Sequence, residues 1–548
     1  MTGCQSKGSG ALGRVGALLL ATSIVFAAAA CGAPPEARHV TASEPVSGGT
    51  LRLIQEVPAG LDPIHSESVY ESLPINQIFD TLVATDESLN VVPSLAEAWH
   101  ISRDGLTYDF NLRKGVRFHD GHELDAGDVV LTFHRVLVEG GTDSLAYPTL
   151  KQIAGAEELA TGKTDGLTGL ERVDDHTVRF TLDDRNPLFL EMLAMDNVAI
   201  VPEHVLAAVG SEAFARAPVG TGPFVFDGWD DARLTLQRND DYFRGRAHLE
   251  SVQLNFYDAD DNDYGYARFK RGELDALEPT TKTYEKLVKC EGVQLFRFQE
   301  LSLSFLGFNS SRAPLDRPWL RRAIAHAVDR DRMVHASPSV RVHAPGILPP
   351  GIAGHTPESK RLEFSPDTAK QILADAGHPN GQGLPPIRLY DPSKGGEPDA
   401  VVRQLVDDLA RIGLRLEVVQ VSWAEMSDRL DSGDYEAFVL AWIADMSDPD
   451  AFLSGFGEGG SGDFFRFEDK RAVDMLAEAA REFEPGRRGK MFRDAEHYIL
   501  QQAPFVPLYH TRGLLATQPA VRGMRPGPFG VAKVELEQVW LQPDEGES

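Results

Sequence analysis

The sequence predicts an α/β protein with mixed sheets, divided into two or three lobes. Strand patterns and helix patterns alternate from Gly49 onward, which is typical of this fold class. About 500 residues follow the N-terminal segment, and that length exceeds what a single hydrophobic core supports. Hydrophobic residues make up 42% of the chain. That share is ordinary for a globular protein, so extensive disorder is excluded.

Residues 1–30 have the order of an export signal. Two basic residues precede the uncharged apolar run Val15–Ala30, no acidic residue occurs, and Cys31 follows directly. This order resembles a bacterial lipoprotein signal peptide that is cleaved just before the cysteine. A plain secretory signal cleaved within Ala27–Ala30 is the alternative. The early position and the alanine-rich end argue against a transmembrane helix.

Lipidation of Cys31 would hold the mature protein on a membrane, because several acyl chains together give stable anchoring. The following residues up to 48 are rich in Pro, Ala, Glu and Ser and show no periodicity. We expect residues 31–48 to form a flexible tether.

Charge and cysteine content exclude several classes of partner. The formal charge of −28 becomes −30 once residues 1–30, with one Lys and one Arg, are removed. Such acidity argues against nucleic acid or an anionic membrane face as partner. Cys4 would leave with the predicted signal and Cys31 would be lipidated, so Cys290 would remain alone. The mature chain therefore has no intramolecular disulfide and no thiolate metal site.

The elements follow from the local periodicity of apolar residues. Strands are predicted where apolar and polar residues alternate, and helices where apolar residues recur behind a capping residue, as behind Asp125 with Asp128 in the first turn. The predicted strands are Thr50–Gln55, Thr107–Leu112 continued by Val116–Phe118, Thr177–Leu182, Phe224–Phe226 paired with Leu234–Gln237, Leu414–Val421 and the buried Tyr435–Trp442. The predicted helices are Pro74–Leu82 (leading into a strand), the segment after Asp125, Trp319–Val328, Ser365–Ala376 and Val401–Ile412.

One short segment combines side chains that bind metals: His119, Asp120, His122, Glu123 and Asp125. Position 126 holds no histidine, so the spacing of a helical histidine pair around a general base is absent. We interpret the segment as a polar turn before a capped helix. No metal site is expected.

Nucleotide and hydrolase motifs are also absent. Residues 457–462 have the glycine spacing of a dinucleotide-binding motif, but no clear buried strand precedes them and no helix follows. We interpret them as a flexible loop. The sequence has no phosphate-binding loop ending in Lys-Ser or Lys-Thr and no Gly-x-Ser-x-Gly motif. ATP hydrolysis, serine-hydrolase chemistry and a cofactor are therefore not expected.

Asp445 stands at the end of an apolar strand, directly after Trp442-Ile443-Ala444 and before the turn Ser447-Asp448-Pro449. A buried lone carboxylate is costly, so it needs a cationic or hydrogen-bonding partner. Either a ligand or a group inside the protein, such as a helix N-terminus or an arginine, could supply that partner. Trp423 and nearby phenylalanines could line a pocket beside it, although aromatic clusters also form ordinary cores.

A series of short motifs runs in order from about Gly48 to the C-terminus. They are Gly49-Thr50-Leu51, Leu61-Asp62-Pro63, Phe79-Asp80-Thr81-Leu82, Pro93-Ser94-Leu95-Ala96-Glu97-Ala98-Trp99, residues 112–121, Gly220-Thr221-Gly222-Pro223-Phe224, residues 238–243, residues 321–330 and Pro504-Phe505-Val506-Pro507-Leu508-Tyr509. In these motifs the chain resembles the family 5 extracellular solute-binding proteins, the peptide and nickel receptors of bacterial ABC importers.

The resemblance implies a periplasmic-binding-protein-like fold: two lobes with a hinge plus an extra domain, three domains in all, with a pear shape. The lobes would close on a ligand about hinge strands near Leu301–Asn309 and Tyr509–Leu515. The implied boundaries are a signal peptide over 1–30, a tether over 31–48, domain I over 49–82, 201–300 and 512–548, domain II over 83–200 and domain III over 301–511.

The resemblance also implies how a ligand is held. In peptide-binding relatives the ligand lies extended and pairs its main chain with receptor strands. An aspartate in a Trp-x-x-Asp motif holds the ligand ammonium, and Asp445 takes that position here, beside Trp442, Ile443 and Ala444. Dipeptide-binding relatives hold the ligand carboxylate with an arginine. Here Pro392 stands at that position, and Lys394 offers only a point charge, which favours longer peptides or a different amine-bearing solute.

We therefore expect a substrate-binding lipoprotein that captures oligopeptides, closes around them and delivers them to the permease subunits of an ABC importer. We expect a monomer in the periplasm or on the outer face of the cell membrane, without enzymatic activity. Three alternatives stay open. The same fold could bind a nickel chelate, haem, an oligosaccharide or an opine; it could act as an extracytoplasmic hydrolase or chaperone; or it could signal through a sensor protein.

Overall fold

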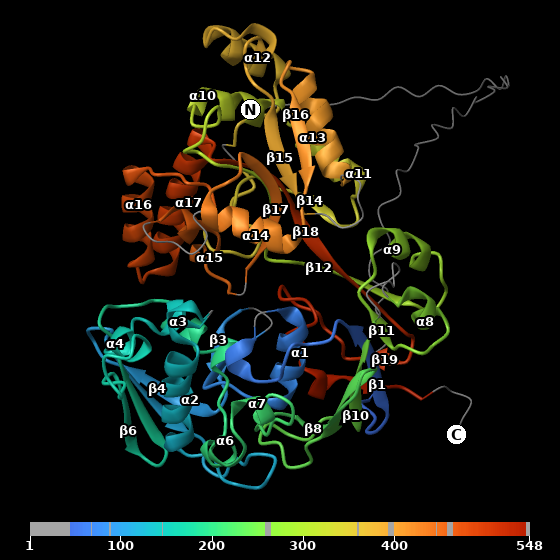
Figure 1. Ribbon diagram of the computed structural model, residues 1–548. Helices are drawn as coiled ribbons and strands as arrows, with labels where there is room; N and C mark the ends of the chain where they lie inside the picture. The colour runs from blue at the N-terminus through green and yellow to red at the C-terminus, as the bar shows by residue number, and fades with distance from the viewer. Residues whose placement is uncertain are drawn as a thin grey trace, which may run out of the picture. The chain divides into compact units, whose positions relative to one another are not determined.

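The computed structural model describes residues 44–543 apart from 67, 87–88, 145, 258–264, 359–360, 393–398, 445 and 458–463. The chain divides into two compact units, Met1–His39 and Val40–Ser548, and the description below concerns the second. The predicted signal, Cys31 and most of the tether lie outside the described residues. Helices and mixed sheets alternate through the second unit (Figure 1), so the predicted α/β fold class is confirmed.

A four-stranded sheet has the order β1-β10-β9-β8. β1 pairs parallel with β10, and the other two pairs are antiparallel, including the predicted hairpin of β8 and β9. Leu51 and Leu53 alternate with more exposed residues along β1, so one face of the sheet packs into a hydrophobic core. The strands are β1 (Thr50–Gln55), β8 (Phe224–Trp229), β9 (Arg233–Arg238) and β10 (Ser251–Phe256).

An antiparallel sheet of four strands, β4-β5-β7-β6, packs against helix α2 (Ala126–Glu139). The helix begins as predicted: the Asp125 carboxylate accepts the Gly127 N–H at 2.6 Å, and Asp128 accepts the Asp125 N–H at 3.0 Å. Phe133 of α2 meets Phe180 of the sheet edge-on at 5.0 Å. The strands are β4 (Ala96–Ile101), β5 (Thr107–Leu112), β6 (Leu170–Asp174) and β7 (Thr177–Thr181).

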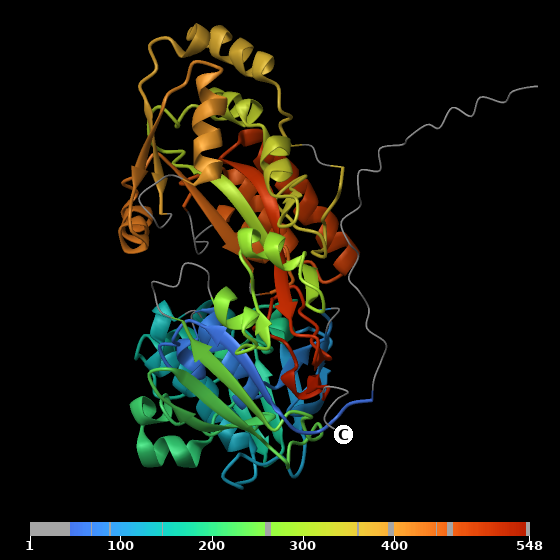
Figure 2. The same cartoon turned by 90° about the vertical axis from the view of Figure 1, so that its right-hand side faces the viewer.

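The largest sheet has eight strands in the order β11-β18-β13-β17-β15-β16, with β12 and β14 also paired to β18. Strand β18 is long. It pairs with β13 and β14 at its start and with β12 and β11 at its end (Figures 1 and 2). The strands are β11 (Ala276–Leu277), β12 (Gln294–Gln299), β13 (Ser302–Phe308), β14 (Arg341–His343), β15 (Ile387–Asp391), β16 (Leu416–Gln420), β17 (Ala437–Ile443) and β18 (Phe505–Thr517).

Strand β18 contributes to several hydrophobic cores. Its Val506 and Leu508 belong to a core beside β13 and β15, whereas Leu515 belongs to the core of the four-stranded β1 sheet. The segments expected to act as hinge strands lie in β13 and β18. The domain boundaries and the hinge motion stay predictions.

The remaining elements are helices and two short hairpins. The hairpins are β2 (Val83–Thr85) with β3 (Val91–Pro93) and β19 (Val521–Arg522) with β20 (Trp540–Leu541). The other α-helices are α1 (Val69–Ile78), α3 (Tyr147–Leu150), α4 (Ala156–Ala160), α5 (Phe189–Met192), α6 (Glu203–Val209), α7 (Ser211–Phe214), α8 (Tyr266–Lys270), α9 (Thr281–Leu287), α10 (Pro318–Ala327), α11 (Arg330–Ala336), α12 (Pro366–Asp375), α13 (Ala400–Ala410), α14 (Trp423–Ser432), α15 (Asp450–Leu453), α16 (Lys470–Ala480) and α17 (Pro485–Gln502).

The predicted start of the first helix at Pro74 is wrong, because α1 begins at Val69 and contains Pro74 in its interior. A proline has no N–H to donate, so the carbonyl of Tyr70, four residues earlier, loses its helical partner. The side-chain amide of Gln55 donates to that carbonyl at 3.0 Å instead. The hydrogen bond that the helix lacks is thus replaced by one from strand β1, and the helix continues through Pro74.

Two other expectations also need correction. Val116–Phe118 is not a strand: Arg117 forms only an isolated bridge with Glu123, and Gly115 turns the chain with a φ of +76°. β17 is fully buried only at its start, whereas Ile443 at its end is 65% exposed. The end of β17 is therefore more exposed to solvent than a central strand normally is.

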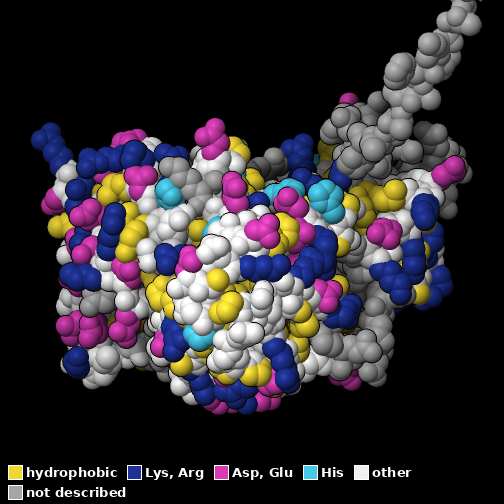
Figure 3. All heavy atoms as spheres, turned by 90° about the horizontal axis from the view of Figure 1, so that it is seen from above, with side chains coloured by type: hydrophobic (Ala, Val, Ile, Leu, Met, Phe, Trp, Pro, Cys, Tyr) yellow, Lys and Arg dark blue, Asp and Glu magenta, His cyan; other side chains and the backbone are white. Residues whose placement is uncertain are grey.

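Among the described residues, no helix is both long and apolar enough to span a membrane. Lys, Arg, Asp and Glu side chains are interspersed on the face seen from the α12 side (Figure 3), so the acidic residues form no single patch there. Cys290 is half-buried, with its sulfur 3.1 Å from the Lys270 ammonium.

Candidate ligand-binding site

Strand β17 leads to the position that the sequence singles out. Along its whole length it pairs antiparallel with β13, from Ala437 opposite Phe308 to Ile443 opposite Ser302. On its other side β15 pairs only with Ala437 and Phe438. No described strand covers that side of residues 439–443. An unpaired strand edge offers its N–H and C=O groups to another extended chain.

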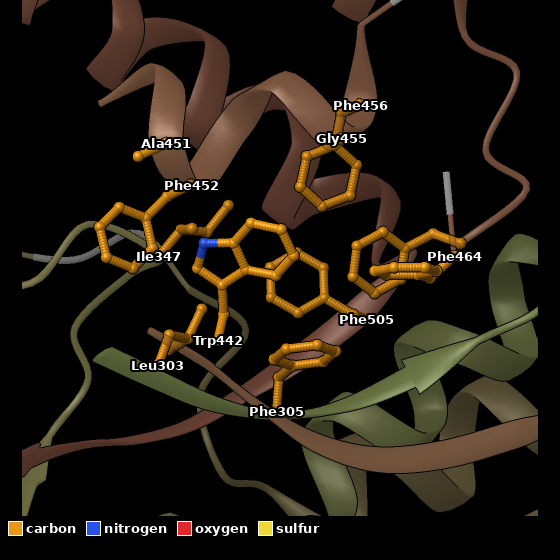
Figure 4. Close-up of a pocket in the computed structure, with 11 residues that line it drawn as sticks. Leu303, Phe305, Ile347, Trp442, Ala451, Phe452, Gly455, Phe456, Phe464 and Phe505 are labelled. Atoms are coloured by element: carbon orange, nitrogen blue, oxygen red, sulfur yellow. The ribbon is translucent and has the colours of Figure 1, made fainter. Parts of the chain in front are cut away.

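Trp442 extends from this part of β17 into an aromatic pocket. In Figure 4 its indole stands at the centre of the surrounding side chains. The cavity left between them is about 30 Å³, and the indole Nε1 is buried without a hydrogen-bond partner within the described part of the chain. The lining consists of Leu303, Phe305, Ile347, Trp442, Ala451, Phe452, Gly455, Phe456, Phe464, Phe465 and Phe505.

Ring-to-ring contacts hold this lining together. Phe456 stacks on Phe465 at 4.8 Å, and Phe305 meets Phe505 edge-on at 5.7 Å. The ring of Trp442 lies 6.5 Å from that of Phe464, at a tilt of 54°. The phenylalanines are therefore packed more closely against one another than Trp442 is against Phe464. The pocket suits an apolar group with one hydrogen-bond acceptor for the indole.

A backbone hydrogen bond from Ala444 anchors the residues that follow Trp442. Ile443 is exposed, but Ala444 is only 4% exposed and its N–H donates to the carbonyl of Leu301 at 2.8 Å. That bond ties the end of β17 to the residue just before β13. Asp445 and Lys394 both lie outside the described residues, so their assignments stay predictions.

The turn after Asp445 is held by a buried ion pair. The guanidinium of Arg488, in α17, donates to both oxygens of Asp448 at 2.9 and 2.8 Å, and both side chains are more than 90% buried. Arg488 also donates to the carbonyls of Ala479 and Ala480, each at 2.8 Å. Its donors are therefore directed at fixed acceptors, which makes this pair a rigid support for the neighbouring backbone.

The same turn contacts α5, which packs into the core of the β4–β7 sheet. The hydroxyl of Ser447 donates to Glu191 of α5 at 3.3 Å, and Met446 packs against that core. Burial, helped by the negative charge of Asp448, raises the pKa of Glu191. Neither Arg488 nor Glu191 was singled out from the sequence, because their partners lie 40 and 256 residues away along the chain.

Trp423 does not join this pocket. It is the first residue of α14, its side chain is 63% exposed, and it is not among the lining residues. Its predicted place beside the ligand stays a prediction without contacts to support it. Pro392 directly follows β15, and no arginine stands there.

Several motifs quoted from the sequence meet elsewhere, in a buried polar cluster. Asp80 accepts hydrogen bonds from the Thr221 hydroxyl at 2.8 Å and the Tyr242 hydroxyl at 2.9 Å. A Cβ on Gly220 would come within 2.0 Å of the carbonyl oxygen of Ile78, so only glycine allows this approach. These motifs join segments of the fold and do not form part of the aromatic pocket.

The fold is that of a multidomain α/β protein with an aromatic pocket on the central strand β17. The sequence profile of "Bacterial extracellular solute-binding proteins, family 5 Middle" matches residues 90–464. The chain belongs to this family of extracytoplasmic solute-binding proteins, which serve ABC importers and bind their ligands without acting as enzymes.

Relatives and solved structures are similar over nearly the whole chain. The chain is 32% identical to Heme-binding protein A of Haemophilus influenzae over 506 residues, covering 87% of this chain and 89% of the relative. It is 27% identical to the Dipeptide-binding protein of Escherichia coli over 534 residues, covering 92% and 96%. The structure of the periplasmic binding protein DppA from Helicobacter pylori, in complex with the peptide STSA, matches with a TM-score of 0.77 at 25% identity, covering 91% and 99%.

Proposed function

We propose that this protein is a lipid-anchored receptor of an ABC importer and that its ligands are oligopeptides. The observation that carries the proposal is the edge of β17 over residues 439–443, which no described strand covers and which leads directly to Asp445. A peptide lying extended along that edge would continue the sheet, with its main chain satisfying the N–H and C=O groups of β17. Main-chain recognition of this kind tolerates many side chains.

Asp445 would hold the ammonium of the bound peptide. The Asp448–Arg488 pair supports this role, because it fixes the backbone three residues further on. Lys394 would attract the carboxylate end as a point charge. The names of relatives agree with this ligand class: one is a dipeptide-binding protein, and one solved neighbour holds the peptide STSA.

The aromatic pocket would receive an apolar side chain of the peptide. The phenylalanine rings, with Leu303 and Ile347, offer such a group a largely apolar lining. A ligand carbonyl that accepts the indole N–H would satisfy the donor left unpaired in the described structure. We expect peptides with one large apolar residue to bind more tightly than all-polar peptides.

Closure of the lobes would be sensed at the turn after Asp445. Ser447 touches Glu191, and Met446 packs against the core of the β4–β7 sheet. These contacts join predicted domains II and III. A ligand held by Asp445 would lie within two residues of them along the chain. These surfaces touch in the described structure, and bending at β13 and β18 would change that contact as the lobes move. The closed form would deliver its peptide to the permease, while the lipid on Cys31 and the tether over 31–48 keep the receptor at the membrane.

The test is mass spectrometry of small molecules that are released when the purified protein is denatured, followed by calorimetric titration with defined peptides. We expect a mixed set of short peptides with free N-termini. Asp445→Asn should lower peptide affinity about 30-fold or more, since losing one member of a buried charge pair costs about 2–5 kcal/mol. The matched control is Asp474→Asn, which removes an exposed carboxylate on α16.

Two results would overturn the peptide proposal. One is a single non-peptide mass in the wild-type protein. The other is an Asp445→Asn variant that binds peptides as tightly as Asp474→Asn does.

Haem is a second candidate, because the relative at 32% identity is named a heme-binding protein and the pocket on β17 is lined by aromatic rings. Titration of the apoprotein with haem, followed by visible absorption, tests it. A saturable spectral change at one equivalent that competes with peptide would favour haem. An unchanged spectrum would leave peptides as the ligand class.

A further inference from the structure

A histidine from a distant helix completes the polar turn that precedes α2. The turn carries Asp120 and His122, and His204 of α6 lies across from both. Nε2 of His204 is 2.5 Å from Asp120 Oδ2, and Nδ1 of His122 is 3.3 Å from the same oxygen. The two imidazole centroids are only 3.8 Å apart. Two imidazoles and a carboxylate therefore converge on one point.

The three side chains are held in place by separate contacts. Asp120 accepts the N–H of His122 through its other oxygen at 3.1 Å, which directs Oδ2 toward the histidines. The ring of His204 rests edge-on against the buried Phe118. The N–H of Glu203, next to His204, donates to Asp128 of α2 at 2.9 Å. The helix that carries His204 is thus fixed to the start of α2, and the His204 ring packs on the segment that carries Asp120 and His122.

We propose that Asp120, His122 and His204 bind a divalent transition-metal ion of the Zn²⁺, Ni²⁺ or Cu²⁺ class. Imidazole nitrogens with one carboxylate are a ligand set these ions accept. Metal–ligand bonds of about 2 Å place neighbouring ligand atoms about 3.3 Å apart around a tetrahedral ion. All three candidate ligand atoms already lie within 4.8 Å of one another, so small side-chain rotations suffice.

The site is separate from the ligand pocket and has a different role. Its residues lie beside the core of the β4–β7 sheet, whereas the pocket is built on β13, β17 and β18. The side chains of Asp120, His122 and His204 are 30%, 64% and 34% exposed, so the ion exchanges with solvent and keeps a water ligand. Bound metal would link the turn to α6 and stabilise this sheet and its helices. This proposal departs from the expectation of no metal site, because His204 is 82 residues from His122 along the chain.

The experiment is a zinc titration of the purified metal-free protein by calorimetry at one neutral pH, with Co²⁺ absorption as a report on coordination. We expect one equivalent of Zn²⁺ to bind and to raise the thermal midpoint. His204→Ala and His122→Ala should each weaken binding at least about tenfold, since loss of even an outer partner costs about 10–100-fold. His122 is well exposed, so its variant tests the site without disturbing the core.

A second histidine pair provides the matched control. His335 and His343 have centroids 6.3 Å apart, and His343 lies 3.2 Å from Asp331. His335→Ala should bind Zn²⁺ as tightly as the wild type. The proposal is overturned if the wild type binds no zinc. It is also overturned if His204→Ala and His122→Ala bind as the wild type does, or if His335→Ala loses as much affinity as they do.

Discussion

Asp448→Asn removes the negative charge that faces Arg488 while keeping the size of the side chain. The guanidinium would remain more than 90% buried with two of its carbonyl acceptors, but without a counter-charge. Removing one partner of a buried ion pair costs about 3–5 kcal/mol, because the other charge stays in a poorly solvated place. An amide oxygen still accepts one hydrogen bond, so we expect the lower end, about 3 kcal/mol.

Thermal unfolding of wild type and variant, followed by calorimetry, measures the effect. For a core of about 150–250 residues each kcal/mol lowers the Tm by about 2–4 °C, so the transition that contains α17 should fall by about 6 °C or more. Asp474→Asn breaks an exposed pair with Lys470 on α16 and should change Tm by about 2 °C or less. If Asp448→Asn shifts Tm no more than this control does, the buried pair does not stabilise the turn and the reasoning is refuted.

Three further predictions test the fold. Gly307→Ala would place a Cβ 2.4 Å from the Phe438 ring, so we expect a loss of about 1–3 kcal/mol in thermal unfolding, and an unchanged Tm would contradict the packing described. Asp125→Ala removes the cap of α2 and should cost about 0.5–2 kcal/mol, whereas Asp125→Ser should retain most of the stability; equal losses would argue against capping. Burial raises the pKa of Glu537 to about 7, so the folded state binds more protons than the unfolded state and loses stability as pH rises from about 4.5 to about 7. The Tm of Glu537→Gln minus the Tm of the wild type should therefore be larger at about pH 8 than at about pH 5. The same difference at both pH values would refute this assignment.

Local chemistry made much of the fold predictable from the sequence. The capping box of α2 can be recognised from two residues three positions apart, Asp125 and Asp128. The β8–β9 hairpin can be recognised from alternating apolar and polar side chains on both sides of a turn. Pro74 shows the limit of such reasoning. A proline normally ends or bends a helix, and the hydrogen bond that offsets it comes from Gln55, nineteen residues earlier in another element.

The site was predictable only where its residues are contiguous. Trp442 and Ala444 could be chosen because they stand at the end of an apolar strand, Trp442 in the pocket lining and Ala444 at the hydrogen bond to Leu301. Arg488 could not, since many arginines occur in the chain and only folding brings this one to Asp448. His204 is missed for the same reason, because a lone histidine in the first turn of an ordinary helix carries no local signal.

Strand β18 also has a consequence for how the protein is made. It is the last strand of the eight-stranded sheet in chain order, and its Leu515 is needed for the core of the β1 sheet as well. Neither core is complete until residues 505–517 have been synthesised, however early the first strands emerge. The polypeptide must therefore stay incompletely folded through most of its synthesis. We expect that state to suit export through a narrow channel before the final structure forms.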